Sequence, residues 1–264
     1  MIYGALWAPP LKSLLVRLPF VRRIYDGWRR VHPFDAAYGI ETSGSVTAGD
    51  CAPNAVMAAQ ISPYGGSQPT IVRRSLAWLP DHGQYAFVDL GCGKGRPLVV
   101  ASEFPFRRLL GIEIAPELAG VARANAAVIA AAFPDRTAIE IQIGDATAVS
   151  LPGELAVYFM YHPFHRSLVI SLVANLESQL EAGLQHAFLV YYNPVHGELL
   201  DSSPRFSRWC AATLPYAPAE IGYGPDLEDT FVIWQTVPER YPPWPRAARA
   251  IIVDGSSGGV RLDA

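Results

Sequence analysis

The chain has 264 residues, of which half are hydrophobic and 17% are charged, and its formal net charge is −3. This composition excludes a disordered or fibrous protein and predicts a globular chain of one or two domains. No uninterrupted apolar run approaches the roughly 18 residues that a membrane span needs, so we expect a soluble, cytoplasmic protein.

The first 31 residues differ from the rest of the chain in charge. They contain six Lys or Arg residues and a single acid, Asp26. We predict a basic helix at about 11–31, which either presents a solvated face or forms an arm for an anionic surface. A second helix is predicted from about Thr70 to Leu79. Residues 1–80 are therefore interpreted as an N-terminal helical lid or substrate segment.

From residue 84, short β-rich segments alternate with longer Ala- and Leu-rich segments, which is the pattern of βαβ units. Five strands are predicted, at 85–91, 108–114, 138–144, 155–161 and 187–193. The intervening helices are predicted at 96–104, 116–133 and 165–183. Beyond residue 195 we predict a helix at 204–214, followed by two strands, "AEIGYG" and "TFVIWQTV", in an antiparallel hairpin at the sheet edge.

These elements predict the α/β fold class. We expect a Rossmann-like, doubly wound and mostly parallel sheet with an antiparallel C-terminal hairpin, preceded by the N-terminal helical appendage. Residues 81–238 form the predicted core. Residues 239–264 are rich in proline and then in glycine and serine, so we expect an extended C-terminal tail there.

The first predicted strand runs directly into three glycines, in "AFVDLGCGKGR" at residues 86–96. Gly91, Gly93 and Gly95 allow a sharp turn and a close approach of the backbone to a ligand. In an open parallel sheet this first βα turn lies where ligands bind. The spacing fits neither the dinucleotide fingerprint nor the phosphate-binding P-loop. Asp89, just before the glycines, favours a cationic or hydroxyl-bearing ligand over a pyrophosphate.

Acidic residues also end the next two strands, Glu113 in "LLGIEI" and Asp145 in "IQIGDAT". A carboxylate in the position of Glu113 can accept hydrogen bonds from both hydroxyls of a ribose. Asp145 can accept one from an exocyclic amine. Because the carboxyl ends of parallel strands meet at one sheet edge, we expect Asp89, Glu113 and Asp145 to surround one nucleoside-type ligand.

Residues 84–236 resemble the class I S-adenosylmethionine-dependent methyltransferases. "VDLGCGKGR" is similar to the first motif of that family, "GIEIAP" to its second and "IGDAT" to its third. The resemblance implies S-adenosyl-L-methionine as methyl donor and S-adenosyl-L-homocysteine as product. It assigns the methionine part to Asp89 and the Gly91–Gly95 loop, the ribose to Glu113 and the adenine to Asp145.

A second resemblance lies upstream, in "SPYGGSQPTIVRRSLAWL". This stretch is similar to the loop that closes over the methyl donor in the seven-strand, non-SET lysine methyltransferases. The resemblance adds Tyr64 and Thr70 to the candidate cofactor-binding residues. A turn followed by a helix N-cap at Thr70 is the alternative interpretation.

The fourth predicted strand runs into "YFMYHPFHR". Amine-directed members of the family have Asn or Asp there, then Pro-Pro and an aromatic residue, and these hold the acceptor nitrogen. Here His162 stands in place of the amide, followed by Pro163 and Phe164. His162 is predicted to be a catalytic base, an orienting group or a structural histidine. Tyr161 and Phe164 are candidate substrate contacts.

The fifth strand ends in "VYYNPVHGE". Tyr192 and His196 are candidate catalytic residues and Asn193 is a candidate substrate contact; a polar strand end with a proline stop is the alternative. His162, His165 and His196 lack the helical spacing of a metal site, so we expect no metal. Cys51, Cys92 and Cys210 are far apart, which favours reduced thiols.

The predicted function is methyl transfer from S-adenosyl-L-methionine to an N or O acceptor of a small molecule or a protein side chain. Two alternatives remain: an RNA methyltransferase that uses the basic N-terminal arm, and a non-catalytic module that binds a nucleoside ligand. We expect no nucleic-acid partner and no transmembrane segment, and we do not favour peripheral membrane contact. The acceptor and the oligomeric state are not predicted.

Overall fold

The computed structural model describes residues 31–151, 154–223, 226–244, 249–253 and 259–263. The predicted basic helix at 11–31 lies outside these residues, apart from its last position. All statements below concern the described part of the chain.

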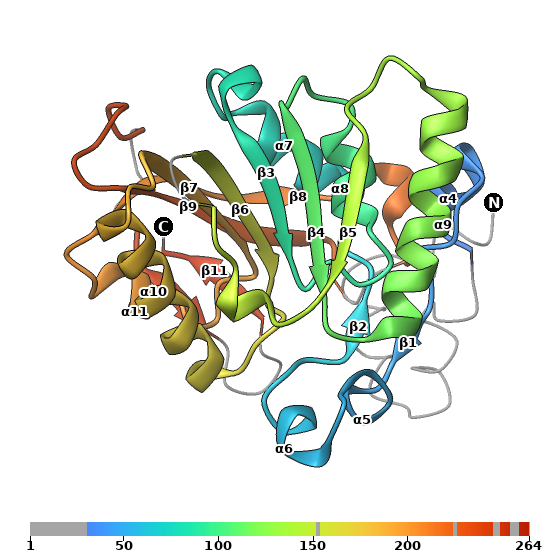
Figure 1. Cartoon of the computed structure of the whole chain (residues 1–264), viewed down its shortest axis with the longest axis horizontal. Helices are drawn as coiled ribbons and strands as arrows, with labels where there is room; N and C mark the ends of the chain where they lie inside the picture. Colours follow the sequence, from blue (N-terminus) through green and yellow to red (C-terminus); the bar gives the residue numbers. More distant parts are fainter. Residues whose placement is uncertain (1–30, 152–153, 224–225, 245–248, 254–258, 264) are drawn as a thin grey trace.

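Seven strands form one sheet with the order β5-β4-β3-β6-β7-β9-β8 (Figure 1). The five parallel strands are β3 (Ala86–Leu90), β4 (Arg108–Glu113), β5 (Ile139–Ile143), β6 (Leu155–Tyr161) and β7 (His186–Tyr192). Antiparallel to β7 runs β9 (Glu228–Thr236), and β8 (Phe206–Pro215) pairs with β9 at the edge. The chain winds outward from β3 in both directions, so the strand order reverses between β3 and β6. This arrangement confirms the predicted fold class.

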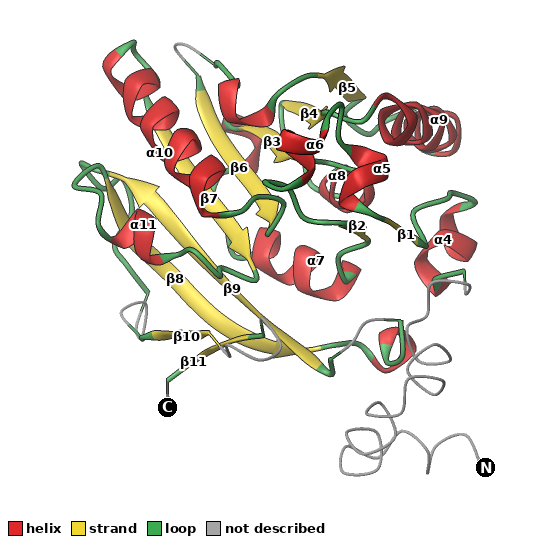
Figure 2. Cartoon of the chain, turned by 90° about the horizontal axis from the view of Figure 1, so that it is seen from below, coloured by secondary structure: helices red, strands yellow, loops and turns green. Residues whose placement is uncertain are grey.

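Helices cover both faces of the sheet because its central strands are buried on both sides. The long helices are α7 (Pro69–Ala77), α9 (Pro116–Ala132) and α10 (Arg166–Glu181), with the shorter α8 (Arg96–Ala101) and α11 (Glu198–Asp201). Figure 2 shows α10 on one side of the sheet and α7 on the other. Each face has its own core: one includes side chains of α7 and α8, the other those of α10. The helices predicted at 96–104, 116–133 and 165–183 are confirmed.

The predicted helix at 204–214 is wrong, because these residues form strand β8. Pairing with β9 extends from Phe206 to Pro215, and this long tertiary contact outweighs the local helical pattern. The predicted strand "AEIGYG" is also wrong. It contains the end of the short 3₁₀ helix η3 (Pro218–Glu220) and a turn at Gly222, which has a φ of 94°. The antiparallel hairpin at the sheet edge is therefore formed by β8 and β9.

The N-terminal segment packs across the carboxyl ends of the central strands. It contains α4 (Pro33–Tyr38), β1 (Ser45–Val46), α5 (Ala48–Cys51), α6 (Ala55–Ala58) and β2 (Tyr64–Gly65). The short strands β1 and β2 pair with each other, and both lie near the ends at which the β3 and β4 arrows point (Figure 1). This segment leads into α7, where the sequence predicts a helix.

Short elements complete the fold. The 3₁₀ helices η1 (His82–Gln84) and η2 (Ala146–Ala148) precede β3 and follow β5. In the predicted extended tail, β10 (Ile251–Val253) and β11 (Val260–Leu262) form an antiparallel pair, and β11 contacts β8 and β9. The boundaries proposed at residues 80 and 238 stay predictions.

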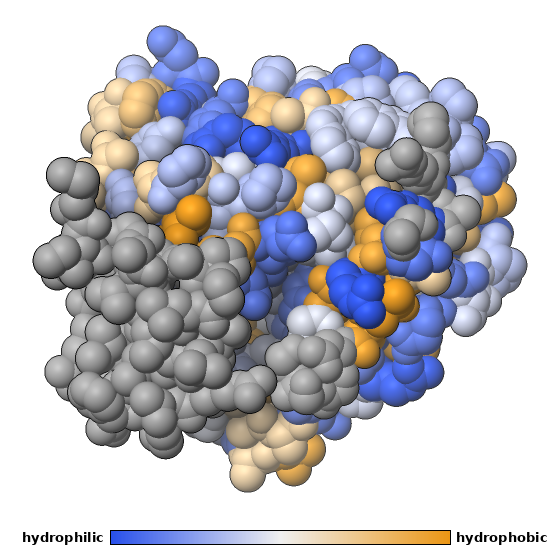
Figure 3. Space-filling model, turned by 180° about the vertical axis from the view of Figure 1, so that it is seen from behind, coloured by the Kyte–Doolittle hydropathy of each residue, from blue (hydrophilic) through white to orange (hydrophobic). Residues whose placement is uncertain are grey.

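No helix in the described ranges is long and apolar enough to cross a membrane. On the face seen in Figure 3, hydrophobic residues outside the grey area are interspersed with hydrophilic ones.

Candidate functional site

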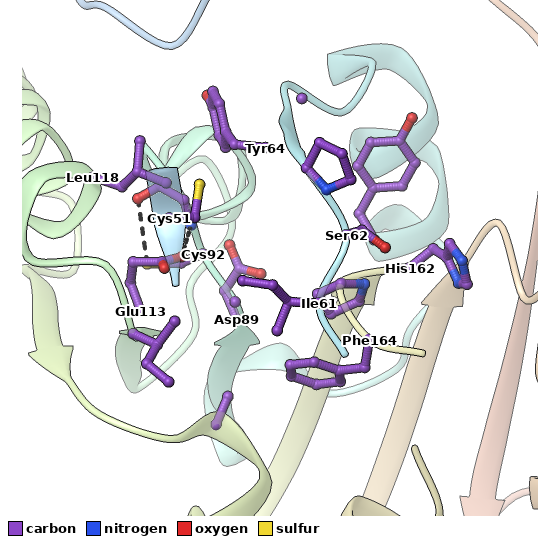
Figure 4. A pocket seen from close by; sticks show the side chains of 18 of the residues that line it. Cys51, Ile61, Ser62, Tyr64, Asp89, Cys92, Glu113, Leu118, His162 and Phe164 are labelled. Atoms are coloured by element: carbon purple, nitrogen blue, oxygen red, sulfur yellow. Dashed lines mark hydrogen bonds between the residues drawn. The ribbon is translucent and has the colours of Figure 1, made fainter. Parts of the chain in front are cut away.

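A cavity of about 250 Å³ lies at the carboxyl ends of the parallel strands, beneath residues 51–67. Figure 4 shows it with side chains from the N-terminal segment facing those from the strand ends. Glu113 and His162 lie at opposite ends of this view. The cavity thus occupies the point where the strand order reverses, which is the general ligand position in open α/β sheets.

The glycine loop forms the floor of the cavity and has a backbone that only glycine adopts easily. Gly91, Gly93 and Gly95 have φ values of 78°, 53° and 83°. A Cβ on Gly91 would lie 2.9 Å from Cβ of Pro163, and one on Gly93 would lie 2.3 Å from Cε2 of Tyr64. Gly91 and Gly93 line the cavity, whereas Gly95 is the N-cap of α8 and lies behind it.

Glu113 is held in place by two backbone amides. Its Oε2 accepts a hydrogen bond from the N–H of Gly93 at 2.7 Å, and its Oε1 accepts one from the N–H of Ala115 at 2.9 Å. Burial raises the pKa of this carboxyl, and the backbone hydrogen bonds oppose the rise. The carboxylate is therefore fixed at the end of β4 beside the glycine loop, where the sequence predicts it.

Asp89 presents the clearest unmet hydrogen-bonding need in the site. The residue is 2% exposed and lines the cavity, and its Oδ2 is buried without a hydrogen-bond partner among the described residues. Burial and then the nearby Glu113 raise its pKa well above the ordinary value. Because buried polar atoms are nearly always paired, this oxygen is a place for a donor group from a ligand.

Asp145 lies at the third strand end, as predicted, and lines the same cavity. Its Oδ1 accepts hydrogen bonds from the N–H and the hydroxyl of Thr147, at 2.8 and 2.7 Å. The apolar side chains of Ile114 and Leu118 line the same cavity. The cavity thus combines a carboxylate with apolar walls, which suits a flat heteroaromatic ring.

The structure brings only one of the two upstream candidates into the site. Tyr64 lines the cavity, and its hydroxyl donates to the carbonyl of Thr42 at 2.7 Å. Thr70 does not line it; its N–H and hydroxyl donate to Oε1 of Glu220 at 2.9 and 2.8 Å. The alternative role of Thr70 as N-cap is wrong, because Gln68 is the N-cap of α7.

The predicted acceptor-side residues Tyr161, His162, Phe164 and Asn193 all line the cavity. His162 and Asn193 directly follow β6 and β7, and both have left-handed backbones, with φ values of 38° and 53°. Such conformations in non-glycine residues are uncommon and concentrate at functional sites. Phe164 is buried and pairs with Ile61 in an isolated antiparallel bridge.

His162 is held by a neighbour on β7. Its Nδ1 lies 3.0 Å from the hydroxyl of Tyr191. Burial lowers the pKa of His162 to about 4, and the charges of His196 and His165 act in the same direction. The imidazole is therefore neutral at pH 7.

Tyr192 and His196 lie behind the lining residues. Tyr192 is fully buried, its ring packs 4.3 Å from that of Tyr161, and its hydroxyl donates to Asp229. The ring of His196 lies 5.5 Å from that of His162. Neither residue lines the cavity itself.

Sequence reasoning missed Arg96, which directly follows the glycine loop. It is 3% exposed and lines the cavity. Its guanidinium donates to the hydroxyl and carbonyl of Thr42, at 2.6 and 2.9 Å, and to the carbonyl of Ser67 at 3.0 Å; Asp35 lies 3.6 Å away. Arg96 thereby ties the N-terminal segment to the glycine loop. The only sequence signal was a charged residue immediately after a loop expected to be buried.

Hydrogen bonds from neighbouring polar side chains also connect the N-terminal segment to the glycine loop. Nζ of Lys94 donates to Oε1 of Glu41 at 2.7 Å and to the carbonyl of Ser43 at 2.9 Å. The amide of Asn125, on α9, donates to the carbonyls of Glu41 and Lys94. Cys51 and Ser62, which the sequence did not single out as ligand contacts, also line the cavity. Among the described residues, no group of three His, Cys, Asp or Glu is placed to hold a metal ion.

No protein-family model and no curated protein matched the sequence. Several solved structures are similar in fold. An RNA methyltransferase from Salinibacter ruber in complex with S-adenosyl-L-homocysteine is 21% identical, with 67% of this chain and 96% of that chain covered and a TM-score of 0.42. An O-methyltransferase from Bacillus cereus in complex with the same product is 16% identical, with coverages of 65% and 82% and a TM-score of 0.45.

A third similar structure is the magnesium protoporphyrin IX methyltransferase from Synechocystis PCC 6803 with bound S-adenosylmethionine. It is 14% identical, with 64% of this chain and 78% of that chain covered and a TM-score of 0.44. The sheet order, the glycine loop and the acids at three strand ends agree with the Rossmann-like, mostly parallel α/β fold that the sequence predicts.

Proposed function

We propose that the protein is an S-adenosyl-L-methionine-dependent methyltransferase that acts on an N or O acceptor of a small molecule or a protein side chain. The observation that carries this proposal is Oδ2 of Asp89, which has no hydrogen-bond partner within the described part of the chain and lies in a cavity that Glu113 also lines. A buried carboxylate that lacks a donor fits the ammonium group of a methionine moiety.

The remaining lining residues fit the other parts of the donor. Glu113, held by two amides, would accept hydrogen bonds from the ribose hydroxyls. Asp145, which lines the same cavity as the apolar Ile114 and Leu118, would accept a hydrogen bond from the adenine amine. Tyr64 closes the cavity over Gly93, where a glycine is needed because the ring leaves no room for a Cβ.

The acceptor would bind at the His162 end of the cavity. When bound, S-adenosyl-L-methionine supplies an electrophilic methyl group, whose bond to sulfur breaks as the acceptor lone pair forms the new bond. Such an in-line displacement depends on alignment and on exclusion of water. Tyr161, Phe164 and Asn193 would align the acceptor, with Tyr192 and His196 supporting Tyr161 and His162 from behind.

Titration calorimetry with S-adenosyl-L-homocysteine tests the donor site without the acceptor. Glu113→Ala removes the proposed ribose contact and should weaken binding by roughly 1.5–3 kcal/mol, the range for a hydrogen bond to a charged group. Glu117→Ala is the matched control, because Glu117 is an exposed acid four residues away on α9. Equal affinity of the folded Glu113→Ala variant and the parent would remove Glu113 from the site.

The class of acceptor requires a transfer assay. Methyl-labelled donor would be incubated with the protein and, separately, with a metabolite extract, unfolded protein and total RNA. We expect label in the metabolite or protein fraction. RNA is the second candidate because residues 1–31 are rich in arginine. Label in RNA, together with RNA affinity that falls steeply with salt, would favour it. Tight donor binding without transfer to any fraction would favour the non-catalytic module.

A further inference from the structure

The imidazole of His162 lies within hydrogen-bond distance of the hydroxyl of Tyr191. Nδ1 and the phenol oxygen are 3.0 Å apart. The two ring planes are nearly parallel, with an interplanar angle of 15° and centroids 6.3 Å apart. The distance between the two atoms is that of a hydrogen bond, with either atom able to supply the proton.

The hydroxyl of Tyr191 needs an acceptor for its proton. Tyr191 is fully buried, and a buried hydroxyl is nearly always hydrogen-bonded. Burial raises the pKa of Tyr191, so the phenol keeps its proton at pH 7. Among the described residues, the side-chain partner of this hydroxyl is Nδ1 of His162. If Nδ1 carried a proton, the phenol would lose this acceptor, so the phenol donates to Nδ1.

This direction determines where the imidazole carries its own proton. A neutral imidazole has one N–H, so a ring whose Nδ1 accepts must carry its proton on Nε2. The charged and titratable groups around the ring are Tyr191 on β7, His196 in the following loop and His165 at the start of α10; the exposed pair of Arg166 and Glu198 lies beyond them. Within the described ranges, none of these groups forms a hydrogen bond with Nε2 of His162.

We propose that Tyr191 is a positioning residue that fixes His162 as the Nε2–H tautomer, so that His162 donates a hydrogen bond to the methyl acceptor and does not remove its proton. The acceptor molecule then carries a hydrogen-bond-accepting atom next to the methylated position, such as a carbonyl or carboxylate oxygen or an unprotonated ring nitrogen. The statement about the acceptor rests on the proposed function, whereas the tautomer does not.

Two-bond ¹H–¹⁵N correlation spectra of the full-length protein at pH 7 test the tautomer. The signals of His162 would be assigned by their loss in His162→Asn. We expect Nε2 to appear protonated and Nδ1 unprotonated. In Tyr191→Phe the preference should be lost, and both tautomers should be populated. Tyr158→Phe is the matched control, because it removes another buried strand phenol, 3.3 Å from Gln179, and should leave the His162 signals unchanged.

A spectrum with the proton on Nδ1 in the parent protein would overturn the proposal, as would a tautomer that is unchanged in Tyr191→Phe. Because the spectra require neither donor nor acceptor, they can fail while the donor site of the proposed function stands. Once an acceptor is found, Tyr191→Phe should raise KM for the acceptor at least threefold and leave donor affinity unchanged. An unchanged KM would also contradict the proposal.

Discussion

Replacing Gly93 by alanine should damage the donor site in two ways. The residue has a φ of 53°, in the left-handed region, and its added Cβ would lie 2.3 and 2.5 Å from Cε2 and Cδ2 of Tyr64. The Tyr64 ring cannot retreat freely, since its hydroxyl is bonded to the carbonyl of Thr42. Either the glycine loop or the Tyr64 side chain must move.

The expected loss of stability in Gly93→Ala has two sources, the left-handed backbone and the contact with Tyr64. A left-handed backbone costs a non-glycine residue about 1–2 kcal/mol. The smaller conformational freedom of alanine in the unfolded chain offsets about 0.4–1 kcal/mol of this. The contact with Tyr64 adds to the net loss, so we expect unfolding to become easier by at least about 1 kcal/mol. For a chain of this size each kcal/mol lowers the melting temperature by roughly 2–4 °C.

Donor affinity should fall more than stability, because the Cβ and the displaced Tyr64 ring both intrude on the cavity. We expect S-adenosyl-L-homocysteine to bind at least about tenfold more weakly, which corresponds to about 1.4 kcal/mol. Calorimetry and thermal denaturation would measure the two effects. Gly120→Ala is the matched control: this exposed glycine lies within α9 with nothing within 4 Å of its Cβ position, so alanine should stabilise the helix by about 0.5–1 kcal/mol.

The clash itself can be isolated with a double variant. In a Tyr64→Ala background the ring is absent, so Gly93→Ala should cost less donor affinity than it does in the parent. Additive effects of the two substitutions would show that the contact is not the cause. Parent-like donor binding by Gly93→Ala alone would refute the reasoning altogether.

Three further predictions concern Arg96, His186 and Thr70. Arg96→Met should lower the free energy of unfolding by about 3–5 kcal/mol in chemical denaturation. The substitution removes the positive partner of Asp35, whose carboxylate then stays buried without it. His186 has a pKa of about 4, lowered chiefly by burial, against about 6.5 when unfolded, so unfolding takes up a proton between these values. Stability should therefore fall as pH drops from about 6.5 to 4, by roughly 1–3 kcal/mol for this group, and His186→Gln should show a smaller slope; an equal slope would contradict the assignment. Thr70→Val should leave donor affinity unchanged and cost about 1 kcal/mol of stability, because it removes the hydrogen bond from the Thr70 hydroxyl to Glu220. A large loss of donor affinity would instead show that Thr70 contributes to donor binding.

The parallel core could be predicted because its signals are local. Each strand is a short run of apolar and β-branched residues, and each helix has its own apolar face, so strand and helix bounds agree with the sequence within a few residues. Residues 204–214 differ because their conformation depends on a partner. Pairing with β9, which begins at Glu228, holds residues 206–215 as a ten-residue strand.

The common position of the three acids in the proposed donor site could be predicted from the sequence for a topological reason. Asp89, Glu113 and Asp145 each end or follow a parallel strand, and parallel neighbours bring their carboxyl ends to one edge. The acceptor half depends on side-chain direction, which strand position alone does not give. Tyr191 and Tyr192 are adjacent in sequence, yet they point to opposite faces of β7, so that one contacts His162 and the other Tyr161.

The position of residues 41–43 beside the cavity could not be predicted from the sequence, for a different reason. Residues 41–43 have no regular structure, and their hydrogen-bond partners Lys94, Arg96 and Asn125 lie 51 to 84 residues away in sequence. Such contacts produce no periodic pattern in the sequence, because each of them needs only one polar residue on either side. A buried arginine directly after a glycine loop is nevertheless informative in retrospect: a guanidinium has five donors and cannot lose its charge, so burying it requires several oxygens from elsewhere in the chain. At Arg96 those oxygens come from Thr42 and Ser67, which is why the segment over the cavity is fixed to the loop beneath it.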